Sequence, residues 1–80
     1  MNPERLAEMA NDIANFFAAE PERSVAIDGI CNHLRWFWEP RMRRQIVAYV
    51  RDHGGKGVSD LARDAVLKLA ELDAASARSA

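Results

Sequence analysis

Residues 24–42 of this 80-residue chain read SVAIDGICNHLRWFWEPRM, and they predict a helix followed by a corner. Its large apolar residues recur at spacings of three and four, which is typical of one face of a helix. Ser24 is placed to cap that helix. Proline fits the first position of a helix and pushes the preceding residue out of helical conformation, so we predict a sharp corner at Glu39-Pro40. The residues predicted to face the core are Ile27, Ile30, Cys31, Leu34, Phe37 and Trp38.

The segment before this stretch predicts another helix, from about residue 3 to about residue 19. Asn2 is placed to cap it, and Pro3 occupies a first helical position. Pro21 ends it. The apolar stripe of this helix consists of Leu6, Met9, Ala10, Ile13, Phe16 and Phe17.

Two more helices are predicted after the corner. The third begins at Pro40 and stops at Gly54-Gly55, with Arg44 and Arg51 outward. Residues 54–57 predict a short flexible connector, after which Ser59 can cap a fourth helix. The residues predicted to point inward are Met42, Ile46, Tyr49 and Val50 in the third helix and Leu61, Ala65, Leu69 and Leu72 in the fourth.

The pattern predicts an all-α protein, a small single-domain bundle of three to four helices over residues 1–73. Residues 74–80 contain only Ala, Ser and one Arg, which predicts a flexible tail. Cys31 is the only cysteine, so no intrachain disulfide can form, and a reducing cytoplasm is expected. No apolar run approaches the roughly 20 residues that span a bilayer, and the first residues do not resemble an export signal. A chain with no membrane association is therefore expected.

The net charge of −1 conceals an uneven distribution along the chain. Residues 1–30 carry two basic and six acidic side chains, and residues 31–56 carry six basic and two acidic ones. Residues 57–80 carry three basic and four acidic ones. The acidic first third either complements the basic middle within the molecule or leaves a basic face for an acidic partner.

Known catalytic and metal-binding patterns are missing from the sequence. Cys31 and His33 are two residues apart on a predicted helix, so their side chains diverge by about 200°, and His53 lies far along the chain. The glycine-rich loop at residues 54–57 lacks the pattern of a phosphate-binding loop and follows a helix instead of a strand. We predict no catalytic, cofactor-binding or metal-binding residue in this chain.

The segment 35–44 interleaves aromatic rings with arginines, which suggests either nucleic-acid binding or a protein interface. The near-neutral net charge argues against nucleic acid. Tryptophan and arginine are frequent hot spots of protein interfaces. Trp36 lies half a turn from the core stripe, on the side of Gly29, a helix-interior glycine that another backbone could approach closely. The residues predicted to bind a partner are Gly29, Trp36, Trp38, Pro40, Arg41, Met42, Arg43 and Arg44.

Several stretches resemble one protein family over roughly residues 2–70. They are residues 2–17 (NPERLAEMANDIANFF), 25–26 (VA), 29–30 (GI), 32–35 (NHLR) and 37–43 (FWEPRMR), together with the Gly54-Gly55 loop. These stretches are similar to the delta subunit of bacterial soluble NAD-dependent formate dehydrogenases. The most specific of them is FWEPRMR, a pattern that helix packing alone would not generate.

The resemblance implies a non-catalytic accessory subunit that binds no cofactor. In that family the catalytic alpha subunit holds a molybdenum or tungsten pterin and iron–sulfur clusters, and beta and gamma subunits carry flavin and further clusters to reach NAD. The implied role is to bind the alpha subunit, in a hetero-oligomer with beta and gamma, and to support assembly or stability. Two alternatives are a transient maturation factor for insertion of the pterin cofactor and a helical nucleic-acid-binding protein.

Overall fold

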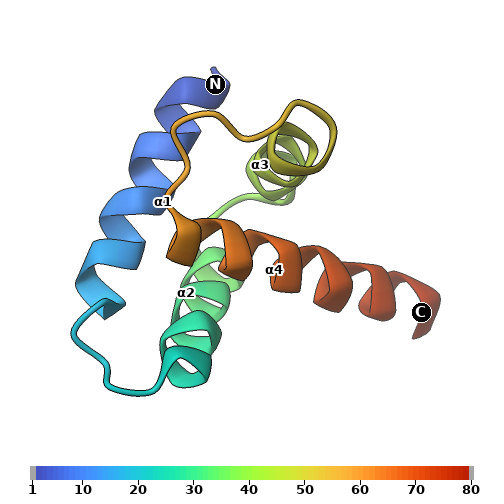
Figure 1. The fold of residues 1–80 in the computed structure, drawn as a ribbon. Helices are drawn as coiled ribbons and strands as arrows, with labels where there is room; N and C mark the ends of the chain where they lie inside the picture. Colours follow the sequence, from blue (N-terminus) through green and yellow to red (C-terminus); the bar gives the residue numbers. More distant parts are fainter. Residues whose placement is uncertain (1, 80) are drawn as a thin grey trace.

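Four helices make up the fold that the sequence predicts. The computed structural model describes residues 2–79, and the side chains of residues 2–76. The helices are α1 (Pro3–Phe17), α2 (Arg23–Phe37), α3 (Pro40–Asp52) and α4 (Asp60–Ser79) (Figure 1). No strand occurs between residues 2 and 79. The prediction of a small all-α bundle is confirmed.

Two of the three predicted N-caps are confirmed. Asn2 Oδ1 accepts the Arg5 backbone N–H at 2.7 Å, and Ser59 Oγ accepts the Ala62 N–H at 3.3 Å. The prediction that Ser24 caps α2 is wrong, because that helix already begins at Arg23. Its N-cap residue makes no side-chain hydrogen bond to the helix, so this helix end depends on tertiary contacts instead of a local cap.

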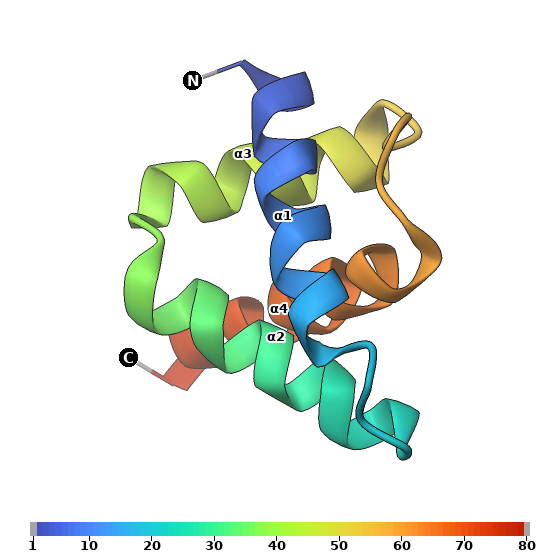
Figure 2. The same cartoon turned by 90° about the vertical axis from the view of Figure 1, so that its left-hand side faces the viewer.

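The helices α2 and α4 pack against each other and form the most extensive helix pair. Three ion pairs join them along their length, and the residue numbers rise together on both helices. The pairs are Arg23–Asp64 at 2.8 Å, Asp28–Lys68, and Arg35–Asp73 at 4.0 Å. The helix α1 passes in front of this pair and of α3 when the molecule is turned (Figure 2).

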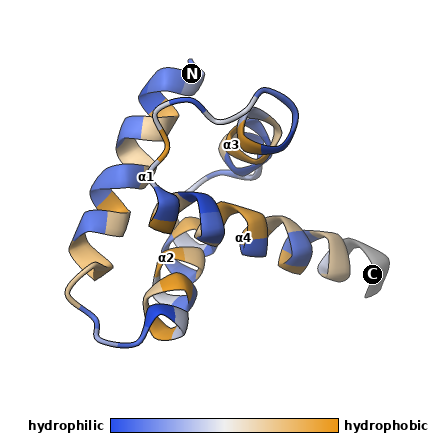
Figure 3. Cartoon of the chain, in the orientation of Figure 1, coloured by the Kyte–Doolittle hydropathy of each residue, from blue (hydrophilic) through white to orange (hydrophobic). Residues whose placement is uncertain are grey.

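All four helices contribute to one apolar core. Hydrophobic and hydrophilic residues alternate along the ribbon of each helix, as the periodicity of the sequence requires (Figure 3). No polar or charged side chain within residues 2–76 is buried. The largest fully buried side chains are Leu6, Ile30, Cys31, Leu34, Ile46, Val66 and Leu69.

The prediction that Phe16 and Phe37 face the core is wrong, since their side chains are 79% and 71% exposed. Each is ten residues after the first residue of its apolar stripe, which at 100° per residue places it about 80° to one side of that residue. Each also lies in the last turn of its helix, where fewer neighbouring helices can cover it. Phe17 and Trp38, one residue further on, lie about 20° from the same reference direction and pack against the core.

The loop between α3 and α4 adopts a conformation that requires glycine. The backbone φ angles of Gly54, Gly55 and Gly57 are 80°, 61° and 89°, which residues with a side chain rarely adopt. Gly55 is also buried, and a Cβ placed there would lie 3.2 Å from Val50 Cα. The glycines therefore allow the chain to turn tightly against the end of α3.

The same loop, predicted to be a flexible connector, is held by side chains from three helices. From α4, Arg63 Nη2 donates to the carbonyls of Gly54 at 3.1 Å and Gly55 at 3.3 Å. Asn11 donates to the Gly57 carbonyl at 2.7 Å and accepts the Ser59 N–H at 2.9 Å. The Tyr49 hydroxyl donates to the Lys56 carbonyl at 2.6 Å. These hydrogen bonds connect the loop to α1, to α3 and to α4, so it is a packed part of the bundle.

The helix α4 continues past the predicted domain end at residue 73, as far as Ser79. No break in the helix marks a boundary between residues 73 and 74. The flexibility of residues 74–79 stays a prediction, and residue 80 of the predicted tail lies outside the described residues.

Candidate partner-binding surface

The predicted corner between α2 and α3 is present. Trp38 and Glu39 have extended backbone conformations, with ψ angles of 137° and 149°, and Pro40 is the first residue of α3. The Trp38 N–H still bonds to the Leu34 carbonyl at 3.0 Å, and the Arg43 N–H bonds to the Glu39 carbonyl at 3.1 Å. The two helices therefore end and begin within two residues, with both helix ends hydrogen-bonded.

Arg43 holds this corner together from the inside. Its Nη1 donates to the carbonyls of Arg35 at 2.9 Å and Trp38 at 3.2 Å, at the end of α2. Its Nε lies 3.4 Å from Asp73 Oδ2 on α4. A cation at the C-terminal end of a helix is favourable, because the last carbonyls lack partners within the helix.

Arg43 was predicted to contact a partner, and the structure instead places its guanidinium group against other residues of the same chain. The side chain is 19% exposed, and its guanidinium group bonds within the chain. Because it joins residues of α2, α3 and α4, its removal would alter the corner itself. We therefore assign Arg43 a structural role.

Trp38 and Met42 also turn inward. The Trp38 residue is 6% exposed and belongs to the core, and Met42 is partly buried against it. Both side chains pack on the core of this chain, and their contact with a partner stays a prediction. They face inward because Trp38 lies close to the centre of the α2 apolar stripe and Met42 begins the inward face of α3.

Gly29 is approached closely, but by a side chain of the same molecule. A Cβ built on Gly29 would lie 2.4 Å from Cε1 of Phe17. The missing side chain therefore lets the Phe17 ring of α1 lie against α2. This packing explains the glycine without the approach of a partner backbone, and contact of Gly29 with a partner stays a prediction.

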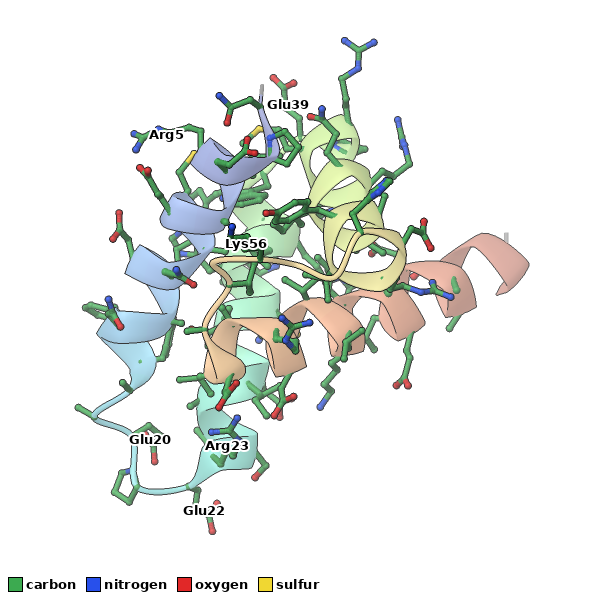
Figure 4. The ribbon with its side chains drawn as sticks, turned by 45° about the horizontal axis from the view of Figure 1, so that its top comes forward. Arg5, Glu20, Glu22, Arg23, Glu39 and Lys56 are labelled. Carbon is green, nitrogen blue, oxygen red and sulfur yellow. The ribbon has the colours of Figure 1, made fainter. Side chains whose placement is uncertain are left out.

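The remaining predicted residues form what we call the corner surface: Trp36, Pro40, Arg41 and Arg44. All four are exposed, and Trp36 is 76% exposed. Arg41 and Arg44 lie three residues apart on α3, and neither forms an ion pair with a described residue. The neighbouring Glu39 lies at the end of the molecule opposite Glu20 and Glu22 of the α1–α2 loop (Figure 4). The corner surface thus combines one large ring with two unpaired cations.

A second feature was missed by the sequence analysis. Asp12, Ile13, Phe16 and Phe17 of α1 and His33 of α2 line a surface depression, which we call the α1–α2 hollow. The rings of Phe16 and Phe17 meet edge to face at a centroid distance of 5.2 Å. The position of Phe16, at the edge of its apolar stripe and in the last turn of α1, is the sequence signal that could have revealed its exposure.

Cys31 is a buried, protonated thiol. Its Sγ donates to the Ala65 carbonyl at 3.0 Å across the α2–α4 contact. Burial raises the pKa of the thiol from 9.0 to about 11, although the nearby Lys68 acts in the opposite direction. The thiol is therefore neutral and inaccessible at neutral pH, and it is unsuited to nucleophilic chemistry in this conformation.

The raised pKa of Cys31 predicts a loss of stability in alkali. The folded chain holds the thiol proton more tightly than the unfolded chain, so the stabilisation is fully present below pH 9 and is lost as the pH rises towards 11. Between pH 8 and pH 11 the wild-type chain should lose on the order of 2 kcal/mol more than Cys31→Ala. Urea unfolding at a series of pH values measures both chains, and an identical pH dependence would contradict the assignment.

Two further findings concern the described residues only. Within them, no group of three or more His, Cys, Asp or Glu side chains is placed to hold one metal ion. No helix in the described part of the chain combines the length and the apolar character needed to cross a membrane.

Comparison with known proteins gives one family. No curated protein and no solved structure shows a significant match to this chain. The model of a family described as "NADH-dependant formate dehydrogenase delta subunit FdsD" matches residues 5–66. That range contains most of α1, all of α2 and α3, the corner between them and the start of α4. The chain therefore belongs to the delta-subunit family of NADH-dependent formate dehydrogenases.

Proposed function

We propose that this chain is a non-catalytic subunit that docks on the catalytic alpha subunit of a multisubunit formate dehydrogenase through the corner surface. Its role there is to support assembly or stability of the complex. One observation carries the proposal: Trp36, Arg41 and Arg44 remain exposed beside a corner whose other side chains, Trp38 and Arg43, are occupied inside the molecule.

The residue types of the corner surface suit a protein contact. An exposed tryptophan presents a large rigid area, because such a ring buries about 150–250 Å² when a partner covers it. Tryptophan and arginine are also the residues most enriched at interface hot spots. The contact would therefore centre on Trp36, with the two arginines beside it.

Arg41 and Arg44 specify what the partner should present. A guanidinium group binds carboxylates through two parallel hydrogen bonds, which favours Asp and Glu side chains on the alpha subunit. The internal hydrogen bonds of Arg43 fix the start of α3, which carries both exposed arginines. A fixed surface loses less conformational entropy on binding than a mobile one.

The non-catalytic part of the proposal rests on the chemistry of the chain's own groups. Its thiol is protonated and buried, so it lacks the properties of a nucleophile. The large exposed features are aromatic rings and unpaired arginines, which are suited to recognition. The proposal also holds that this chain carries no cofactor of its own when it is bound to the alpha subunit.

Co-purification tests the docking surface. The tagged chain is expressed with the alpha, beta and gamma subunits, and the charge-reversed variant Arg41→Glu/Arg44→Glu is compared with it. The variant should recover at least tenfold less alpha subunit, because two attractive contacts become repulsive. Arg51→Glu/Lys56→Glu makes the same charge change at two exposed positions outside the corner surface and should recover as much as the wild type.

The same preparation distinguishes a subunit from a maturation factor. A subunit stays in the purified, active enzyme in a fixed ratio to alpha, whereas a factor that inserts the pterin cofactor leaves once insertion is complete. Equal recovery of alpha with the reversed and the wild-type chains would rule out the corner surface. A tagged chain absent from the active enzyme would rule out a permanent subunit.

A further inference from the structure

The α1–α2 hollow is a second surface, with chemistry different from that of the corner surface. Its walls are the apolar side chains of Ile13, Phe16 and Phe17, with His33 from the neighbouring helix. Phe16 is 79% exposed, although a residue of this kind normally stabilises a protein by being buried. Phe16 is exposed next to the other apolar side chains of the hollow, so it belongs to a contiguous apolar surface of the kind that marks interaction sites.

Asp12 gives this apolar hollow a negative charge. It lines the hollow one helical turn before Phe16 on α1, and its carboxylate makes no ion pair or hydrogen bond with another described residue. No Lys or Arg side chain lines the hollow. The site therefore offers aromatic faces, an apolar wall and one free carboxylate within a small area.

We infer that the α1–α2 hollow binds an arginine or lysine side chain presented by an apolar segment of a second polypeptide. The long stem of such a side chain packs on the apolar wall while its charged head reaches the carboxylate of Asp12. The same cation lies over the face of Phe16, where the electrons of the ring attract it. Charge and shape both favour this occupant over an acidic one.

Gly29 determines the shape of the hollow. Because it has no Cβ, the ring of Phe17 can lie against α2, and a methyl group there would meet that ring at 2.4 Å. Any side chain at position 29 would displace the ring of Phe17, which is one of the walls of the hollow. The glycine therefore has a consequence at the surface as well as in the packing of α1 on α2.

The hollow and the corner surface require partner groups of opposite charge. His33, which lines the hollow, contacts Phe37 at a centroid distance of 4.8 Å, and Phe37 is the last residue of α2 before the corner. The aromatic side chains at the hollow are thus followed along α2 by one further ring, that of Phe37. The proposed function assigns an acidic partner group to the corner, and this inference adds a basic partner group at the hollow.

The inference can be tested on the isolated full-length chain, independently of the formate dehydrogenase complex. The probes are two synthetic amphipathic helical peptides of identical apolar sequence, one with arginine and the other with glutamate at its charged positions. Amide NMR spectra of the labelled chain are recorded during each titration. The arginine peptide should shift amides in residues 12–17 and 29–37, and the glutamate peptide should not.

Two variants separate charge from shape. Asp12→Asn removes the carboxylate and should weaken binding of the arginine peptide about two- to fivefold. Gly29→Ala should weaken it as well by displacing Phe17. The gain of about 1 kcal/mol in helix propensity offsets part of the cost of the clash, and urea unfolding of this variant checks that it remains folded during the titration. Glu71→Gln removes an exposed carboxylate outside the hollow and should leave the affinity unchanged.

Three outcomes would overturn the inference. One is equal binding of both peptides at the hollow, which would indicate apolar contact without charge selection. Another is binding that Asp12→Asn leaves unchanged. The third is a set of concentration-dependent shifts at the same residues without peptide, which would show that a second copy of the chain covers the hollow. Because the probes contain no enzyme subunit, failure here leaves the result of the co-purification experiment intact.

Discussion

Leu34→Ala is expected to lower the free energy of unfolding of this chain by about 3 kcal/mol, within the range of about 2–5 kcal/mol typical of fully buried leucines. Leu34 is fully buried on α2, in a core to which all four helices contribute. Domains of this kind are stable by only about 5–15 kcal/mol in total. The substitution should therefore shift the urea midpoint strongly while the chain still folds.

Leu67→Ala is the matched control, because it makes the same chemical change at a leucine that is 40% exposed on α4. Surface substitutions of this kind usually change stability by less than about 0.5 kcal/mol. Urea unfolding followed by circular dichroism measures both variants. If Leu34→Ala and Leu67→Ala lower the free energy of unfolding by the same amount, the helix faces assigned to core and surface are wrong.

Arg43→Met should destabilise the chain by about 2 kcal/mol. Methionine keeps the apolar stem of arginine but removes two hydrogen bonds to backbone carbonyls and the ion pair with Asp73. Hydrogen bonds to charged groups contribute about 1.5–3 kcal/mol each when partly buried, and the loss is smaller where water replaces the partner. The same variant should also weaken docking, because the start of α3 is less firmly held.

Arg44→Met provides the comparison, because Arg44 is exposed on the same helix and forms no ion pair with a described residue. It should leave stability within about 0.5 kcal/mol of the wild type. In the co-purification experiment, by contrast, Arg44→Met should reduce recovery of the alpha subunit. The reverse pattern, with Arg44 important for stability and Arg43 neutral, would contradict the division between the corner's interior and its surface.

Local signals predicted the helices well. Asn2 and Pro3 begin α1, Pro40 begins α3 and Ser59 caps α4, because capping and proline geometry depend on residues only a few positions apart. The inward faces were largely right for the same reason, since the helical period depends on spacing alone. These are the features that one helix determines by itself.

The roles of side chains between helices were not predictable in this way. Arg43 and Arg44 are adjacent arginines, yet only Arg43 lies within reach of the α2 carbonyls and of Asp73. That difference depends on how α3 turns away from α2 at the corner and on where α4 ends, which no local pattern specifies. The role of Gly29 was equally unpredictable, because the side chain that packs against it is Phe17 on another helix.

The ion pairs between helices show how the uneven charge distribution along the chain is used. None of the ion pairs among the described residues joins the acidic first third of the chain to the basic middle. The residues of α4 instead pair with both parts, through Asp64, Lys68 and Asp73. Arg41 and Arg44 remain without an ion-pair partner among the described residues, which leaves positive charge at the corner available for recognition.

Site-specific photo-crosslinking within the assembled enzyme tests the central claim most directly. A photoreactive amino acid is placed at position 36 or 41 of the corner surface, or at position 20 in the α1–α2 loop at the opposite end (Figure 4). The account predicts cross-links from positions 36 and 41 to the alpha subunit and none from position 20. Cross-links from position 20 alone, with the chain still present in the complex, would contradict it.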